Sequence, residues 1–72
     1  MEDTLKVQID STFGRFEFSN GENWNLKDKG DYFIERTIQT LLSNSQYYRY
    51  VDSEEGWFYV SKKRFELAKK IQ

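Results

Sequence analysis

The sequence predicts an α+β domain in the order ββα-ββα, with one antiparallel four-stranded sheet and two helices on one face of it. Short segments alternate apolar and polar residues, which is typical of strands that are buried on one side. Two longer segments repeat apolar residues at helical spacing. The chain of 72 residues contains no proline and little low-complexity sequence. We therefore expect a single small domain over residues 1–72, without an internal linker.

A first hairpin is predicted over residues 5–9 and 15–19, because apolar residues occupy every second position in both segments. Gly14 precedes the second strand and can adopt the positive φ that a tight turn requires. Residues 19–23 are of turn-forming types, and residues 24–29 are expected to continue as a loop. The apolar face of this hairpin should pack on the helices.

Two helices are predicted, over residues 31–43 and 62–71. Asp31 is the expected N-cap of the first helix, and Ser61 is that of the second. The apolar residues of the first helix fall at i, i+4, i+7 and i+8, on one face: Ile34, Ile38, Leu41 and Leu42. Those of the second helix also share one side: Phe65, Leu67, Ala68 and Ile71.

A second hairpin is predicted over residues 47–51 and 57–60, joined by an acidic loop at residues 52–56. One of its faces would carry Tyr48, Tyr50, Phe58 and Val60. The other face would carry Tyr47, Arg49, Val51, Trp57 and Tyr59. A sheet that helices cover on one side needs apolar residues on that side only, so the aromatic residues of the second face are a surplus.

The surplus aromatic face has two interpretations. Either the segment around Trp24 or the N-terminus covers it, or it is an exposed surface that binds a partner. Tyr, Trp and Arg dominate binding hot spots, and large apolar patches are uncommon on free monomers. The predicted binding residues are Tyr47, Arg49, Trp57 and Tyr59. If this face binds a partner, Trp57 and Tyr59 should be exposed, while core rings such as Phe16, Phe58 and Phe65 should be buried.

The composition excludes most of the common kinds of catalytic site. The chain contains no histidine and no cysteine, so it lacks the commonest general base, the thiol nucleophile, disulfides and the usual zinc ligands. Its four glycines follow no phosphate-binding pattern. A calcium loop starting at Asp52 would need Glu at its twelfth position, where the chain has Lys63. We therefore expect no enzyme activity, no metal site and no cofactor.

Charge is distributed unevenly, although the net charge is only −1. Residues 1–61 carry 6 basic and 11 acidic side chains, whereas residues 62–72 carry 5 basic and 1 acidic. The basic end supports an alternative in which the start of the last helix contacts nucleic-acid phosphates through Ser61, Lys62, Lys63 and Arg64. Arg64 also falls within the apolar arc of its helix, so it should either extend to solvent or meet a buried acid.

These patterns favour a non-enzymatic protein-binding module, a small inhibitor or accessory factor, whose partner is another protein or a second copy of the chain. The alternative is a nucleic-acid-binding protein. Exposed rings can stack on unpaired bases, but the acidic loop near Arg49 opposes this use of the aromatic face. The N-terminus lacks a secretory pattern and no apolar run is long enough to cross a membrane, so we expect a cytoplasmic protein. Abundant Lys, Asn, Tyr and Ile are consistent with a phage or mobile-element origin.

Overall fold

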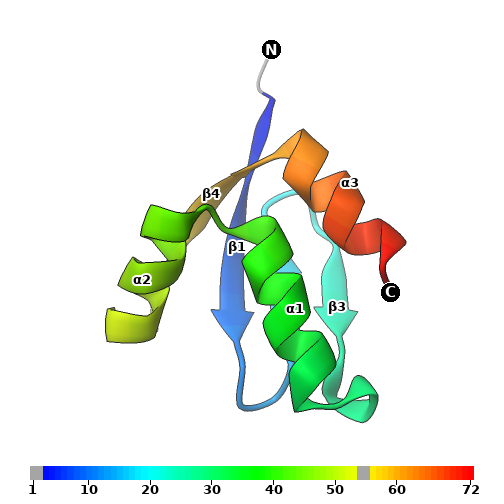
Figure 1. The fold of residues 1–72 in the computed structure, drawn as a ribbon. Helices are drawn as coiled ribbons and strands as arrows, with labels where there is room; N and C mark the ends of the chain where they lie inside the picture. The colour runs from blue at the N-terminus through cyan, green and yellow to red at the C-terminus, as the bar shows by residue number, and fades with distance from the viewer. Residues whose placement is uncertain (1–2, 54–55) are drawn as a thin grey trace.

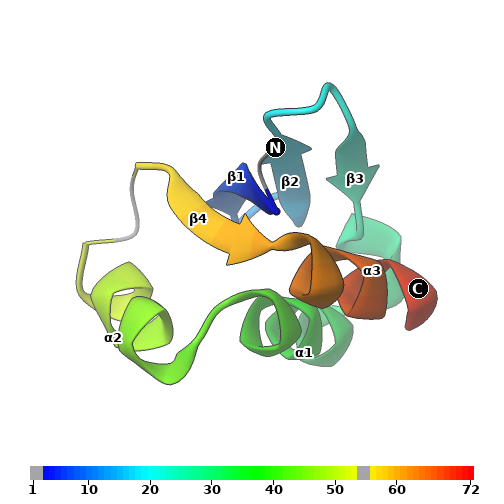
Figure 2. The ribbon, with the colours of Figure 1, turned by 90° about the horizontal axis from the view of Figure 1, so that it is seen from above.

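The computed structural model describes residues 3–53 and 56–72. Its four strands form one antiparallel sheet in the order β3-β2-β1-β4 (Figure 1). All three α-helices of the described residues lie on the same side of this sheet, as Figure 2 shows. The elements are β1 (Thr4–Asp10), β2 (Arg15–Phe18), β3 (Asn23–Asn25), the 3-10 helix η1 (Lys27–Lys29), α1 (Asp31–Leu41), α2 (Asn44–Ser53), β4 (Phe58–Ser61) and α3 (Lys62–Lys70). The predicted α+β class and four-stranded antiparallel sheet are confirmed, with three helices in place of two.

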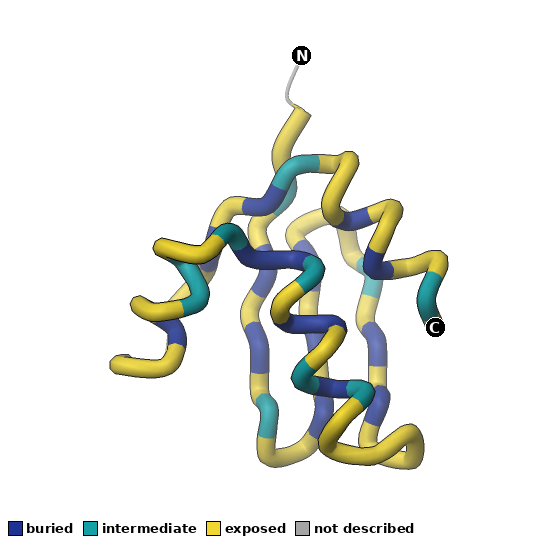
Figure 3. Tube along the Cα trace, in the orientation of Figure 1, coloured by how far each residue is buried: buried dark blue, intermediate teal, exposed yellow. Residues whose placement is uncertain are grey.

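The hairpin of β1 and β2 forms as predicted. Buried and exposed residues alternate along both strands (Figure 3). Gly14, in the turn between them, has φ 62°, and its carbonyl oxygen accepts a hydrogen bond from the amide of Leu26 at 2.7 Å. A Cβ at this position would lie 2.8 Å from the backbone nitrogen of Lys27. Glycine is therefore required here both by the left-handed backbone and by the close approach of another segment.

Strand β3, which pairs with β2 at one edge of the sheet, lies in a segment that the sequence predicts as a loop. Trp24 pairs with Phe16 in the register of β2 and β3, and its side chain is buried. Its ring stacks on Phe65 of α3, with the ring centres 5.3 Å apart, and lies 4.4 Å from the ring of Phe18. A strand of three residues with a single buried side chain is too short to show an alternating pattern.

The segment predicted as a strand over residues 47–51 is helical and belongs to α2, so the predicted second hairpin is wrong. Tyr and Val favour strands, but the start of α2 carries a reciprocal cap. The Ser43 amide donates to Oε1 of Gln46 at 3.0 Å, and the Gln46 amide donates to Oγ of Ser43 at 3.4 Å. This Ser-x-x-Gln capping box satisfies two donors that a helix start otherwise leaves free. Residues 54 and 55 of the predicted acidic loop lie outside the described residues.

The two predicted helices are confirmed, with small differences at their ends. Helix α1 starts at Asp31, but its N-cap is Gly30, and Asp31 is the first helical residue. It ends at Leu41 because Leu42 is extended, at ψ 143°. Helix α3 has the predicted cap: the Ser61 hydroxyl accepts a hydrogen bond from the Arg64 amide at 3.1 Å. No helix among the described residues is both long and apolar enough to cross a bilayer.

Strand β4 returns to the start of the chain and pairs with β1. Val7 lies opposite Phe58, and Lys6 lies opposite Tyr59. Phe58 and Val60 are buried under the helices. The chain then enters α3, whose first amide, that of Lys62, donates to the carbonyl oxygen of Asp3 at 2.8 Å. The core therefore lies between the helices and the inner face of the sheet, and the outer face carries no helix among the described residues (Figure 2).

Candidate functional site

The four residues predicted as one binding face are divided between two elements. Tyr47 and Arg49 lie on α2, while Trp57 and Tyr59 lie at β4. The Tyr47 hydroxyl donates a hydrogen bond to the carboxylate of Glu35 on α1, and this bond raises the pKa of Tyr47 above its usual value. The Arg49 guanidinium lies 5.8 Å from the centre of the Phe58 ring. Both α2 residues therefore contribute contacts that hold α2 against the rest of the fold.

Trp57 and Tyr59 are exposed as predicted, at 45% and 61% of their surface. Trp57 directly precedes β4, two residues from Tyr59, so the alternation of an extended chain places both rings on the outer side of the sheet. Phe58, which lies between them, is 5% exposed. Phe16 and Phe65 are also buried, as predicted.

Two other assignments of the predicted hairpin faces need correction. Tyr48 was expected on the buried face, but it is 73% exposed, because its position on a helix is not set by strand alternation. The segment around Trp24 was one expected cover for the aromatic face. It forms β3, and Trp24 lies in the core on the inner face of the sheet. Nothing among the described residues therefore covers Trp57 and Tyr59 in the way that interpretation required.

The outer face of the sheet has two ends of different character. Toward β2 the outer face carries charges of both signs, and Arg15 of β2 lies directly opposite Asp10 of β1. Glu17 projects from the same face, opposite Gln8. At the end formed by β4, an exposed ring faces a cation, because Lys6 lies directly opposite Tyr59. The β4 end therefore combines aromatic area with positive charge on the sheet itself. In the turn between β1 and β2, the exposed Phe13 ring also has cations near it, with Arg15 5.8 Å and Lys27 5.7 Å from its centre.

A recess of about 470 Å³ lies beside Tyr59. Its polar lining comes from the first half of β1, the turn after β2, β4 and the first residue of α3: Thr4, Lys6, Ser19, Asn20, Tyr59 and Lys62. Tyr59 belongs to the predicted aromatic surface and Lys62 to the predicted phosphate contact, so the structure joins one residue of each in a single recess. Lys6 was not predicted, because no local pattern shows that β1 and β4 are neighbours.

The remaining residues of the predicted phosphate contact have structural roles. Ser61 is the N-cap of α3. Nη1 of Arg64 donates to the carbonyl oxygens of Thr40 at 3.2 Å and Leu42 at 3.4 Å, at the end of α1. Arg64 therefore neither extends freely into solvent nor meets a buried acid; its positive charge caps the negative end of a neighbouring helix. Lys63 is exposed, next to Lys62 in the chain.

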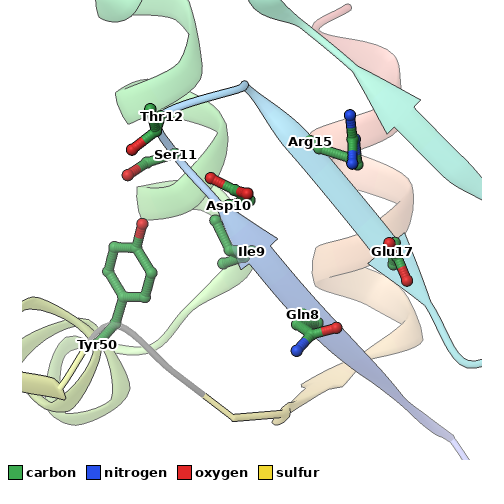
Figure 4. Close-up of a pocket in the computed structure, with 8 residues that line it drawn as sticks. All are labelled: Gln8, Ile9, Asp10, Ser11, Thr12, Arg15, Glu17 and Tyr50. Carbon is green, nitrogen blue, oxygen red and sulfur yellow. The ribbon is translucent and has the colours of Figure 1, made fainter.

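A second recess, of about 390 Å³, lies between the end of β1, the outer face of β2 and α2. Tyr50 reaches into it from α2, with its hydroxyl directed toward Ser11 and Thr12 (Figure 4). Asp10 and Glu17 also line it, but both are exposed on the outer face rather than enclosed. No group of His, Cys, Asp or Glu among residues 3–53 and 56–72 could hold a metal ion. We therefore place the candidate site at Tyr59.

The candidate site thus consists of two exposed rings at β4, Trp57 and Tyr59, with Lys6 and Lys62 beside the second ring. The chain was compared with known protein families, with curated proteins and with solved structures, and none of these comparisons found a match.

Proposed function

We propose that the protein is a non-enzymatic binding module of the cytoplasm, an inhibitor or accessory factor, that docks on another protein through Trp57 and Tyr59. The observation that supports this most is the exposure of both rings on an uncovered sheet face, while Phe58 between them is buried. Trp and Tyr are the residue types that contribute most to hot spots in protein interfaces. Tyr47 and Arg49 of the predicted surface lie on α2, so the proposed contact is centred on β4.

The exposed parts of these two rings contribute little to the folding free energy of the unbound protein. Covering apolar surface gains about 25 cal/mol per Å², and a ring of Trp or Tyr can bury on the order of 150–250 Å². A partner that covers the exposed part of both rings would therefore gain several times the thermal energy from them. Because 45% of Trp57 and 61% of Tyr59 is exposed, only the free energy of burying that exposed part is available to a partner.

Partner capture with matched variants tests this proposal. The wild-type chain and its Trp57→Ala, Tyr59→Ala and Tyr32→Ala variants are immobilised and exposed to lysate of the source cells. Tyr32 is a suitable control because it is an exposed ring on α1, away from β4. We expect a protein that the wild type and Tyr32→Ala retain and that both β4 variants lose, by about 2 kcal/mol or more in affinity. Equal capture by Trp57→Ala and the wild type would contradict the proposal.

The partner can also be a second copy of this chain. Sedimentation equilibrium at several concentrations distinguishes this case, because self-association depends on protein concentration. If the β4 rings form the dimer contact, Trp57→Ala should shift the monomer–dimer equilibrium toward monomer. A mass that stays monomeric at every concentration would leave a different protein as the partner.

Nucleic-acid binding is the second candidate function. It is supported by the recess in which Lys6 and Lys62 flank Tyr59, because single strands are bound by rings that stack on bases and by cations that contact phosphates. Within the predicted phosphate contact, the side chains of Lys62 and Lys63 form no hydrogen bond or ion pair with the described residues, unlike those of Ser61 and Arg64. Binding to single-stranded oligonucleotides that weakens steeply with added salt would favour this candidate over the first.

A further inference from the structure

We infer that the protein partner is acidic where it touches the sheet: it places an Asp or Glu carboxylate between Lys6 and Lys62 while a neighbouring apolar side chain packs on Tyr59. The inference rests on the proposed function and adds the chemistry of the partner. It follows from three features of the recess at β4, which are the convergence of two cations, their lack of acidic partners and the donor groups around them.

The two lysines come from different elements and line the same recess. Lys6 is fixed on β1 by the register that places it opposite Tyr59. Lys62 is fixed at the start of α3, because its amide donates to the carbonyl oxygen of Asp3 at 2.8 Å. The backbone therefore places two lysine side chains at the lining of one recess. Like charges repel, so an anion between them lowers the electrostatic energy of both.

Neither lysine has an acidic partner among residues 3–53 and 56–72. Glu22, the acid in the turn beside the recess, is paired with Lys69 of α3 at 3.3 Å. Asp3 contributes its backbone carbonyl to Lys62 and forms no ion pair with it. The positive charge at this recess is therefore not neutralised by the described part of the chain.

The polar neighbours of the lysines are already partly occupied. The Ser19 hydroxyl accepts a hydrogen bond from the Lys6 amide at 3.0 Å. The Asn20 side chain is bonded to Glu22 through both its oxygen and its nitrogen. The groups left to donate to a ligand are the two ammonium groups and the hydroxyls of Thr4, Ser19 and Tyr59, because the Ser19 hydroxyl keeps its own proton. A site that offers donors and positive charge suits a carboxylate, which only accepts.

The charge of the rest of the outer face favours a carboxylate on a protein over a phosphodiester strand. A nucleic acid carries a charge at every nucleotide and is normally bound by an extended basic groove. Beyond Lys6 along the outer face lie two acids, Asp10 and Glu17, and one cation, Arg15, so this part of the sheet is not the continuous basic groove that a polyanion needs. A protein segment needs only one or two acids at the recess and can place apolar residues on the rings.

The test uses a display library of short random peptides, selected for binding to the immobilised wild-type chain. We expect the selected peptides to be enriched in Asp or Glu next to an apolar residue. Their affinity should fall about tenfold or more for the Lys6→Gln/Lys62→Gln variant, because a buried charge contact is lost. It should be unchanged for Lys29→Gln/Lys70→Gln, which loses the same charge away from the recess. Matching thermal melts show that all variants are folded.

The outcomes separate the inference from the proposed function. Peptides without acidic enrichment, or peptides that bind Lys6→Gln/Lys62→Gln as well as the wild type but lose affinity for Tyr59→Ala, overturn the inference and leave the function standing. Peptides that bind Trp57→Ala and Tyr59→Ala as well as the wild type overturn the function. Fluorescent oligouridylate serves as a second probe. If the wild type binds it more tightly than any selected peptide, and the lysine variant loses that binding, the recess holds phosphate and the carboxylate assignment is wrong.

Discussion

The two faces of the sheet use the same residue types in opposite ways. On the inner face, Phe18 and Trp24 pack with Phe65 of α3, and all three rings are buried. On the outer face, Trp57 and Tyr59 are exposed, and Lys6 and Lys62 line the recess beside Tyr59. The rings of the inner face stabilise the fold, and those of the outer face form the surface that we propose for a partner. The role of an aromatic residue here is therefore set by the side of the strand on which it falls, and not by its type.

The largest expected effect comes from the inner face. Phe58→Ala should lower the free energy of unfolding by about 3–5 kcal/mol, because it leaves a cavity beside Tyr50 and the inner side of β4. Small domains have only about 5–15 kcal/mol in total, so the variant should unfold at a much lower urea concentration. Urea titration followed by circular dichroism measures this. A midpoint like that of the wild type would show that the two faces do not differ.

An intermediate effect is expected at the contact of α3 with α1. Arg64→Ala should cost about 1 kcal/mol, because it removes the cation that caps the carbonyl oxygens of Thr40 and Leu42. Lys63→Ala, its exposed neighbour, should change stability by less than about 0.5 kcal/mol. Paired urea titrations of the two variants measure the difference. Equal midpoints for both would mean that the Arg64 bonds add nothing to stability.

A small effect on stability is expected on the outer face. Trp57→Ala should cost less than about 1 kcal/mol, since nearly half of the side chain is already exposed. Thermal melts at several protein concentrations measure it and detect a dimer that buries the ring, because only a dimer makes the melting temperature depend on concentration. If Trp57→Ala lowered stability as much as Phe58→Ala does, at every protein concentration, Trp57 would belong to the core and the contrast between the two faces would be wrong.

The smallest effect concerns α2 and depends on pH. The hydrogen bond to Glu35 raises the pKa of Tyr47 in the folded chain above its usual value of 10.0. The protonated phenol is therefore favoured by folding, so its contribution to stability is complete below pH 10 and is lost as pH rises through the raised pKa. Tyr47→Phe should thus be slightly less stable than the wild type at neutral pH, and the difference should shrink in alkali. A difference that grows with pH would contradict this sign.

The sequence predicts those elements that bury one regular face. Strands β1, β2 and β4 alternate clearly, and α1 repeats apolar residues over three turns. The sequence did not predict strand β3, because Trp24 is the single buried residue of this strand and gives no alternating pattern. Helix α2 was predicted as a strand because its Tyr and Val residues favour strands. The capping box of Ser43 and Gln46 and the spacing of Tyr47 and Tyr50 were signals of a helix.

The candidate site was predictable only in part, because only some of its features follow from local patterns in the sequence. The exposure of Trp57 and Tyr59 follows from alternation within one strand, which is a local property. The position of Lys6 depends on the pairing of β1 with β4, which no local pattern reveals. Arg64 was recognisable as an unusual residue in an apolar arc, but its partners are backbone carbonyl oxygens, which every residue carries. Side-chain patterns therefore locate exposed rings better than they locate the groups that surround them.

The central place of β1 has a consequence for how the chain reaches its structure. Strands β1, β2 and β3 are neighbours in sequence and can pair early, since short loops close quickly. The other edge of β1 is completed only by β4, whose Phe58 must find Val7 across most of the chain. Until then, a nascent chain presents an unpaired edge with apolar Leu5 and Val7 on it. Such an edge is a template for strands of other molecules, so the hazard of aggregation falls in the interval before β4 pairs with β1.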